Sequence, residues 1–324
     1  MRLSRELLFI CTLWALPLGA VLGKEPNLQF RVIQISPAWE ENLHEVGLWH
    51  PRHVEAEYND KPNKPLTGLI IISHGFSGNL QGHRDTAEAL ARQGYLVAAP
   101  THLDLHGLKL GQPDYDPLIA RPKHIQEVIK FLINDPLFKQ HPLKDNIGMI
   151  GFSLGAYTVL VSAGATPDFH SLDGYCEIKP NDILLCSEQA QRRLSSLGPT
   201  SLSAFEFDIK AAVLLAPAYG PLFSEQSLVK VDMPIKIYSA EQDRDLDNRF
   251  NAHHFARALP TNPEEEIVQE AGHFVFMAPC NDALKKAAPY ICKDADAVNR
   301  KDIHRNMNRD IIEFFNRVND SSDS

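Results

Sequence analysis

The chain has 324 residues, of which 44% are hydrophobic and 23% are charged, an ordinary globular composition that excludes disordered and fibrous proteins. Its 32 basic and 41 acidic residues give a formal net charge of −9, which argues against a basic nucleic-acid-binding protein. Length alone suggests two domains, although α/β folds of this size often form one.

The first 23 residues have the layout of a secretory signal peptide. Arg2 and Arg5 precede an apolar stretch that Pro17 and Gly19 interrupt, and small residues follow. The interruption leaves the stretch short of the roughly 20 apolar residues that a membrane-spanning helix requires. We therefore expect residues 1–23 to be removed and the mature chain to be secreted or periplasmic, without stable membrane insertion.

After this segment, strand patterns alternate with helical patterns along the chain. We expect strands at residues 29–35, 53–58, 69–72, 95–99, 147–150, 211–215, 235–239 and 266–269, the first two forming an antiparallel pair. We expect helices at residues 84–93, 122–134, 156–162, 248–259 and 301–318, with Pro122 in a first turn. This alternation predicts a mostly parallel central sheet with helices on both faces.

The regular alternation breaks at residues 164–207, which contain Cys176, Cys186 and mixed polar sequence. We interpret this segment as an insertion that follows the helix at 156–162. Because the chain has no internal repeat and no long linker, we expect a single domain at residues 24–318. The polar residues 319–324 predict a flexible tail.

One motif carries the chemistry: Gly151-Phe152-Ser153-Leu154-Gly155 directly follows an expected strand and precedes an expected helix. This is the pattern of a nucleophile elbow, in which a tight, strained turn exposes the serine hydroxyl. The same Gly-x-Ser-x-Gly pattern also occurs in ordinary glycine-rich turns that have no catalytic role. The strand and helix on either side favour Ser153 as a nucleophile.

A serine nucleophile needs a base, and the base needs an orienting carboxylate. In this motif's fold the chain order is serine, then acid, then histidine. Asp243 and His273 each follow an expected strand, where open α/β sheets place their sites. We therefore predict a triad of Ser153, Asp243 and His273. The alternatives left open are Asp245, Asp247, Glu241, His253 and His254.

An oxyanion hole combines the backbone N–H after the nucleophile with another from the loop after the third strand. We expect these donors to be the N–H groups of Leu154 and Phe76. His74, two residues before Phe76, is interpreted as structural. His102 and His106 lie four residues apart, but no third ligand accompanies them, so no metal is expected. Without dinucleotide or phosphate-binding motifs, no cofactor is expected either.

The chain resembles the serine α/β-hydrolases of the dienelactone-hydrolase-like and platelet-activating-factor-acetylhydrolase-like group, which are related to cutinase-like polyesterases. The resemblance spans about residues 65–318 and rests on Ser73–Phe76, Gly151–Tyr157, Ala240–Asp243 and Gly272–Phe276 with Cys280. It implies an α/β-hydrolase fold and hydrolysis of short- to medium-chain carboxylic esters without a cofactor. Its substrates would be small-molecule or lipid esters, such as platelet-activating-factor-like phospholipids.

Three positions depart from the pattern of this group. Dienelactone hydrolase itself uses a cysteine nucleophile where this chain has Ser153, so lactone specificity does not carry over. The relatives often have histidine at the position of Phe152 and glycine at the position of Ala156. The alternatives are an acyltransferase that uses the same triad with a lipid or sterol alcohol, and a non-catalytic binding protein on the same fold.

The chain has five cysteines, and an odd number cannot all pair in disulfides within an exported protein. Cys11 lies in the expected signal peptide, and the remaining four allow three disulfide connectivities. Pairing of near neighbours, Cys176–Cys186 and Cys280–Cys292, keeps each bridge within one local segment. We expect this pairing.

Overall fold

The computed structural model describes residues 27–37, 42–56, 64–198, 202 and 204–322. The predicted signal peptide, including Cys11, lies outside the described residues. Within the described residues, no helix is long and apolar enough to cross a membrane.

The fold is built on an eight-stranded sheet with the strand order β1-β2-β4-β3-β5-β6-β7-β8. The strands are β1 Leu28–Ile35, β2 His44–Pro51, β3 Leu69–Ser73, β4 Leu96–Pro100, β5 Ile147–Phe152, β6 Ile209–Leu215, β7 Ile235–Ala240 and β8 Glu264–Val268. β2 pairs antiparallel with both β1 and β4, and from β4 to β8 every pairing is parallel. The mostly parallel sheet is the α/β-hydrolase fold that the sequence predicts.

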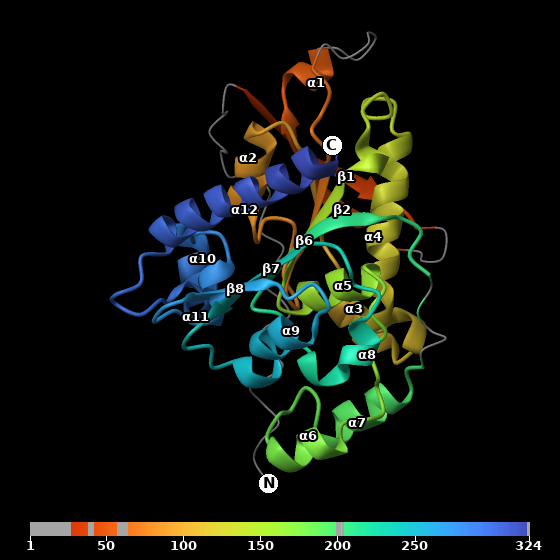
Figure 1. The fold of residues 1–324 in the computed structure, drawn as a ribbon, viewed down its shortest axis with the longest axis vertical. Coiled ribbons are helices and arrows are strands. Elements are labelled where there is room, and N and C mark those ends of the chain that lie inside the picture. The colour runs from red at the N-terminus through yellow and green to blue at the C-terminus, as the bar shows by residue number, and fades with distance from the viewer. Residues whose placement is uncertain (1–26, 38–41, 57–63, 199–201, 203, 323–324) are drawn as a thin grey trace.

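Helices cover both faces of this sheet (Figure 1). They are α1 His53–Ala56, α2 Arg84–Arg92, α3 Asp104–Leu110, α4 Pro117–Asn134, α5 Leu154–Ser162, α6 Asp173–Ile178, α7 Glu188–Ser195, α8 Glu225–Leu228, α9 Ala252–Ala258, α10 Asp282–Ala287, α11 Pro289–Cys292 and α12 Arg300–Ser322. The helices α2 and α12 pack on one face, and α4, α5 and α9 pack on the other.

The alternation of side chains along β3 divides the interior into two hydrophobic cores. Leu69 and Ile71 face the core under α4 and α5, whereas Ile70 and Ile72 face the core under α2 and α12. Because both faces are covered, all four side chains are almost completely buried. This explains why the strand is a continuous apolar run in the sequence.

The prediction of a strand at 53–58 is wrong. The antiparallel partner of β1 is β2 at His44–Pro51, and the chain then forms the short helix α1 at His53–Ala56. β2 pairs with β1 along its whole length and with β4 through Val46–Trp49. Its side chains are buried on both faces of the sheet, so it lacks the polar alternation that marks an exposed strand.

The helix expected at 122–134 begins five residues earlier, at Pro117. The side chain of Asp116 caps it by accepting a hydrogen bond from the Leu118 N–H, so Pro122 lies inside the helix rather than in its first turn. Proline has no backbone N–H, so the carbonyl four residues before Pro122 loses its usual hydrogen bond within the helix. The hydroxyl of Tyr157 donates to that carbonyl, on Leu118, over 3.1 Å.

The helix α12 extends to Ser322, into the segment for which the sequence predicts a flexible tail. The side chain of Asn319 donates a hydrogen bond of 2.8 Å to the Tyr95 hydroxyl, which anchors this end of the helix to the body of the protein. The next residue, Asp320, is exposed. Residues 323–324 lie outside the described part of the chain.

Two disulfides are present, Cys176–Cys186 and Cys280–Cys292, with Cα–Cα distances of 5.4 and 5.8 Å. The first joins α6 to Cys186, just before α7, in the region interpreted as an insertion, and the second joins Cys280, two residues before α10, to the last residue of α11. In Figure 1 α6 and α7 lie at the lower end of the molecule, beyond α8 and α9. Disulfides persist in oxidising compartments, so both bridges fit an exported protein.

The bond between Tyr157 and the Leu118 carbonyl yields a test of the α4 geometry. Replacing Tyr157 with Phe leaves a buried carbonyl without its donor, which should lower the free energy of unfolding by about 1–3 kcal/mol. Urea unfolding followed by circular dichroism measures the change. Tyr290→Phe, at a position that is 60% exposed, is the control and should have little effect. Equal losses in the two variants would contradict the interpretation.

Candidate active site

Ser153 occupies the turn between β5 and α5, at the carboxyl end of the central strand. Its backbone has φ 53° and ψ −117°, a conformation that L residues rarely adopt. The turn is held by a hydrogen bond of 2.9 Å from the Ser153 N–H to the Leu215 carbonyl on β6. The strain at Ser153 is the expected geometry of a nucleophile elbow.

The flanking glycines are required by close packing and not by their own backbone angles. A Cβ on Gly155 would lie 1.9 Å from the carbonyl oxygen of Ser73, and one on Gly151 would lie 2.4 Å from that of Gly155. A Cβ on Gly75 would lie 3.5 Å from the Cβ of Ser153. The loop after β3 therefore packs directly against the turn that carries Ser153.

Asp243 and His273 meet at the same edge of the sheet, following β7 and β8. The Nδ1 atom of His273 donates to Oδ2 of Asp243 over 2.7 Å, and both side chains are at least 95% buried. Oδ1 of Asp243 accepts from the N–H groups of Asp245 and Leu246, which fixes the carboxylate. With Nδ1 bonded to Asp243, Nε2 is the nitrogen of His273 that can act as a base.

The imidazole of His273 lies beside the nucleophile turn. Its ring centroid is 4.9 Å from that of Phe152, the residue before Ser153. His273 begins a short 3₁₀ turn, His273–Phe276, whose Val275 carbonyl is bonded to Nε2 of His304 over 2.8 Å. The structure thus brings Asp243 and His273 into direct contact and places the imidazole against Phe152, the residue before Ser153. Among the hydrogen bonds of the described residues, none joins the Ser153 hydroxyl to His273.

Of the rival residues, Asp245 is exposed and donates its N–H to Asp243, and the other acids and both histidines have other partners. Asp247 caps the turn at Arg249 and pairs with Lys179, and the hydrogen bonds from Arg249 lower the pKa of this carboxyl. Glu241 accepts the N–H of Glu270. The remaining histidines bond elsewhere, His253 to Glu265 and His254 to the Phe223 carbonyl.

The two predicted oxyanion donors lie on the loop after β3 and at the start of α5, two segments that pack together at Ser153. Leu154 is the first residue of α5, so its N–H has no acceptor within the helix. Phe76 lies in the loop after β3, and its ring is 50% exposed. Within the described residues, neither backbone N–H has a hydrogen-bond acceptor. Both groups are available to a ligand.

His74 is neutral and structural, as the sequence suggests. Its Nε2 accepts the His102 N–H over 2.9 Å, so the proton resides on Nδ1, which donates to the Gly75 carbonyl over 2.6 Å. Burial, with a smaller contribution from Arg121, lowers the pKa of His74 to about 3. Arg121 and its partner Asp104 were not identified from the sequence. Their only sequence signal is charge within otherwise apolar segments.

The histidine pair considered for metal binding is not brought together. His102 is buried before α3, with its ring nitrogens 3.1 Å from Oγ of Ser73 and 3.3 Å from Nδ1 of His124. His106 is exposed on α3 and lies 3.3 Å from Nδ2 of Asn42. Among the described side chains, no group of three His, Cys, Asp or Glu residues is arranged to hold a metal ion.

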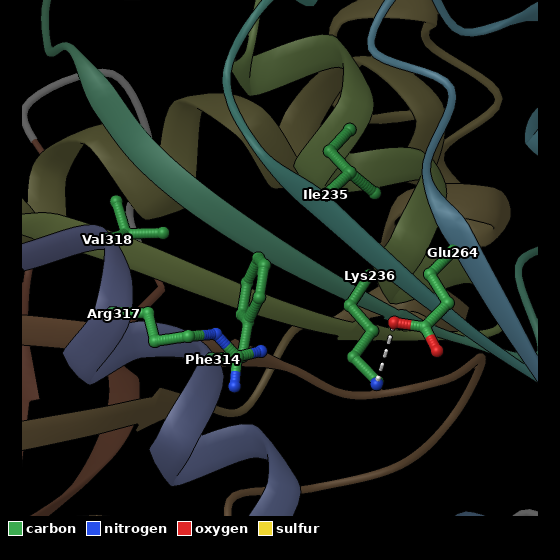
Figure 2. Close-up of a pocket in the computed structure, with 6 residues that line it drawn as sticks. All are labelled: Ile235, Lys236, Glu264, Phe314, Arg317 and Val318. Atoms are coloured by element: carbon green, nitrogen blue, oxygen red, sulfur yellow. Dashed lines mark ion pairs between the residues drawn. The ribbon is translucent and has the colours of Figure 1, made fainter. Parts of the chain in front are cut away.

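A pocket of about 330 Å³ lies at the opposite end of the sheet (Figure 2). It is lined by Ile235, Lys236, Glu264, Phe314, Arg317 and Val318. Lys236 and Glu264 lie near the amino ends of their strands, far from the carboxyl ends that carry the candidate triad. The Lys236 amine pairs with Asp310 over 2.7 Å, so its charge is already neutralised by the protein. This pocket is not part of the candidate site.

The disulfide-bridged segment borders the loop that holds Asp243. Lys179, just after α6, pairs with Asp247 over 2.7 Å, and the ring of Tyr175 packs edge-on against that of Phe250 at 5.1 Å. These contacts place the insertion beside the site.

No protein-family model matches the sequence, and no curated protein matches it. Among solved structures, the crystal structure of a predicted CIB-like hydrolase from Thermoplasma acidophilum is similar, with a TM-score of 0.49 and 12% sequence identity over 88% of this chain and 99% of that chain. The narrower subgroup that the motifs resemble stays a prediction.

The buried histidines near the site predict how stability depends on pH. Burial lowers the pKa of His83 to about 4, so below pH 6.5 the unfolded chain binds a proton there that the folded chain does not. Stability should therefore fall between pH 6.5 and 4, and His83 should contribute about 1.4 kcal/mol per pH unit to the slope. Urea unfolding at several pH values should give a shallower slope for His83→Gln. The exposed His106→Gln variant is the control and should keep the original slope.

Proposed function

We propose that the chain is a secreted serine hydrolase that cleaves carboxylic esters through an acyl-enzyme. The observation that carries the proposal is the hydrogen bond of 2.7 Å between His273 and Asp243, beside a serine held at φ 53°. A fixed carboxylate, an oriented imidazole and a strained nucleophile are the parts that acyl transfer requires. The two disulfides support export.

In the proposed mechanism, Ser153 Oγ attacks the ester carbonyl while Nε2 of His273 takes the serine proton. The N–H groups of Phe76 and Leu154 stabilise the oxyanion of the tetrahedral intermediate. His273 then protonates the departing alcohol, which leaves the acyl group on Ser153. Water attacks this acyl-enzyme with His273 again as base, releasing the acid and restoring the serine. Asp243 holds the imidazole tautomer and stabilises the imidazolium at each step.

The proposed substrates are esters with short to medium acyl groups, including small lipid esters. The half-exposed ring of Phe76, next to its proposed oxyanion donor, supplies an apolar surface for an acyl chain. The segment around Tyr175, packed beside the Asp243 loop, would limit the size of the group that enters. The proposal involves no cofactor and no nucleic acid.

Active-site substitutions test the proposal. With p-nitrophenyl acetate and butyrate as substrates, Ser153→Ala should lower kcat by about 10⁴–10⁶-fold. Asp243→Asn should lower kcat by about 10⁴-fold, because the amide favours the wrong imidazole tautomer. A fluorophosphonate probe should label the unmodified protein and not Ser153→Ala. The matched control is Ser162→Ala, a buried serine at the far end of α5, which should retain labelling and activity.

Full activity or labelling in the Ser153→Ala protein would overturn the assignment. Adding an alcohol acceptor to the assay separates hydrolysis from acyl transfer. The proposed hydrolase should yield mainly free acid, whereas a predominance of new ester would identify an acyltransferase. Absence of labelling in the unmodified, folded protein would favour a non-catalytic binding protein.

A further inference from the structure

A buried ion pair lies directly behind the loop that carries Phe76. Arg121, on α4, is completely buried, and Asp104, the first residue of α3, is 3% exposed. The guanidinium binds the carboxylate through two hydrogen bonds, Nε to Oδ1 at 2.7 Å and Nη2 to Oδ2 at 2.6 Å. This bidentate geometry fixes the orientation of both groups.

The other hydrogen bonds of this pair converge on one loop. Nη1 of Arg121 donates to the His74 carbonyl over 2.6 Å, and Nη2 donates to the Gly75 carbonyl over 3.1 Å. Oδ2 of Asp104 accepts the Ser77 N–H over 2.8 Å. The backbone groups before and after Phe76 are therefore held, and the Phe76 N–H between them is left for a ligand.

The conformation of this loop is one that the chain would not adopt without support. Ser77 has φ 57°, a left-handed conformation that is unfavourable for a serine. The hydrogen bond from its N–H to Asp104 holds it there. A Cβ on Gly78 would lie 2.8 Å from Nδ1 of His74, so the loop also folds tightly over that ring. The ion pair therefore determines the direction of the backbone at Phe76.

A contribution to folding stability does not by itself explain a buried ion pair such as Arg121–Asp104. Apolar residues of similar volume often replace a buried ion pair without loss of stability, because removing two charges from water is costly. A charged pair can, however, hold three backbone groups in fixed directions, which apolar side chains cannot. Fixed donors are what an oxyanion hole requires, since they then need no reorganisation when charge develops.

We propose that Arg121 and Asp104 are positioning residues that set the Phe76 N–H in the oxyanion hole. The proposal rests on the proposed esterase function. Neither side chain touches the substrate, and both act through the backbone of the His74–Ser77 loop. Their loss should weaken binding of the tetrahedral oxyanion and leave binding of the neutral ester nearly unchanged.

The test compares Arg121→Lys and Asp104→Asn with a matched control. Losing one oxyanion donor costs about 10²–10³-fold in kcat, so displacing the Phe76 N–H should lower kcat by at least about tenfold. KM should stay within about threefold of the original value. The control is Arg300→Lys, since Arg300 is 6% exposed, binds Asp294 through two hydrogen bonds and donates to a backbone carbonyl. It should leave kcat within about threefold.

Inhibitor binding separates positioning from a general structural role. A trifluoromethyl ketone adds to Ser153 to form an oxyanion, whereas the matching methyl ketone binds largely as the neutral carbonyl. In Arg121→Lys, the Ki of the trifluoromethyl ketone should rise in proportion to the loss of kcat/KM, and the Ki of the methyl ketone should not. Equal weakening of both inhibitors, or variants indistinguishable from Arg300→Lys, would overturn the proposal.

If both variants fail to fold, amide hydrogen exchange of the unmodified protein tests the positioning role instead. The Ser77 N–H, bonded to Asp104, should exchange slowly, and the Phe76 N–H should become protected only when the trifluoromethyl ketone is bound. Rapid exchange at Ser77, or no change at Phe76, would overturn the proposal. An unmodified protein with no esterase activity and no labelling of Ser153 would instead refute the proposed function.

Discussion

The rest of the candidate site depends on one close contact, between the end of β3 and the turn at Ser153. Gly155 packs so tightly on the Ser73 carbonyl that an added Cβ would lie 1.9 Å from it. The contact forces two neighbouring strands to present their following loops side by side. It places the loop of Phe76 against Ser153, the proposed nucleophile, which is held at φ 53°. Larger residues at this crossing would separate the nucleophile from its proposed oxyanion donor.

Around this contact, buried charges are paired at the carboxyl edge of the sheet. Asp243 is bonded to His273 and also accepts two backbone N–H groups, and Asp104 is bonded to Arg121 and also accepts the Ser77 N–H. Such closed networks are strong in a low-dielectric interior, and they leave little freedom for their members to move. Rigidity is useful here, because the proposed chemistry requires donors and a base that are already in place.

The elements that the sequence predicts correctly are those whose pattern reflects burial on both faces, such as β3 and β5. The errors occur where tertiary contacts override local signals. β2 is enclosed between two strands, Pro122 is tolerated inside α4 because Tyr157 takes the free carbonyl, and the polar end of α12 is held by Tyr95. In each case the deciding partner is distant in the chain, so no local pattern contains the information.

The sequence by itself determined the mostly parallel sheet, the candidates Ser153 and His273, and a short group of candidate acids around Asp243, because an elbow motif and strand-end positions are local features. Tertiary structure alone decided which acid meets the base, since Asp243 and its neighbours are alike in sequence and differ only in their partners. It also revealed Arg121, which lies 47 residues from the carbonyl of His74 that it binds. Such a role depends on where α4 packs, and packing is a property of the whole fold.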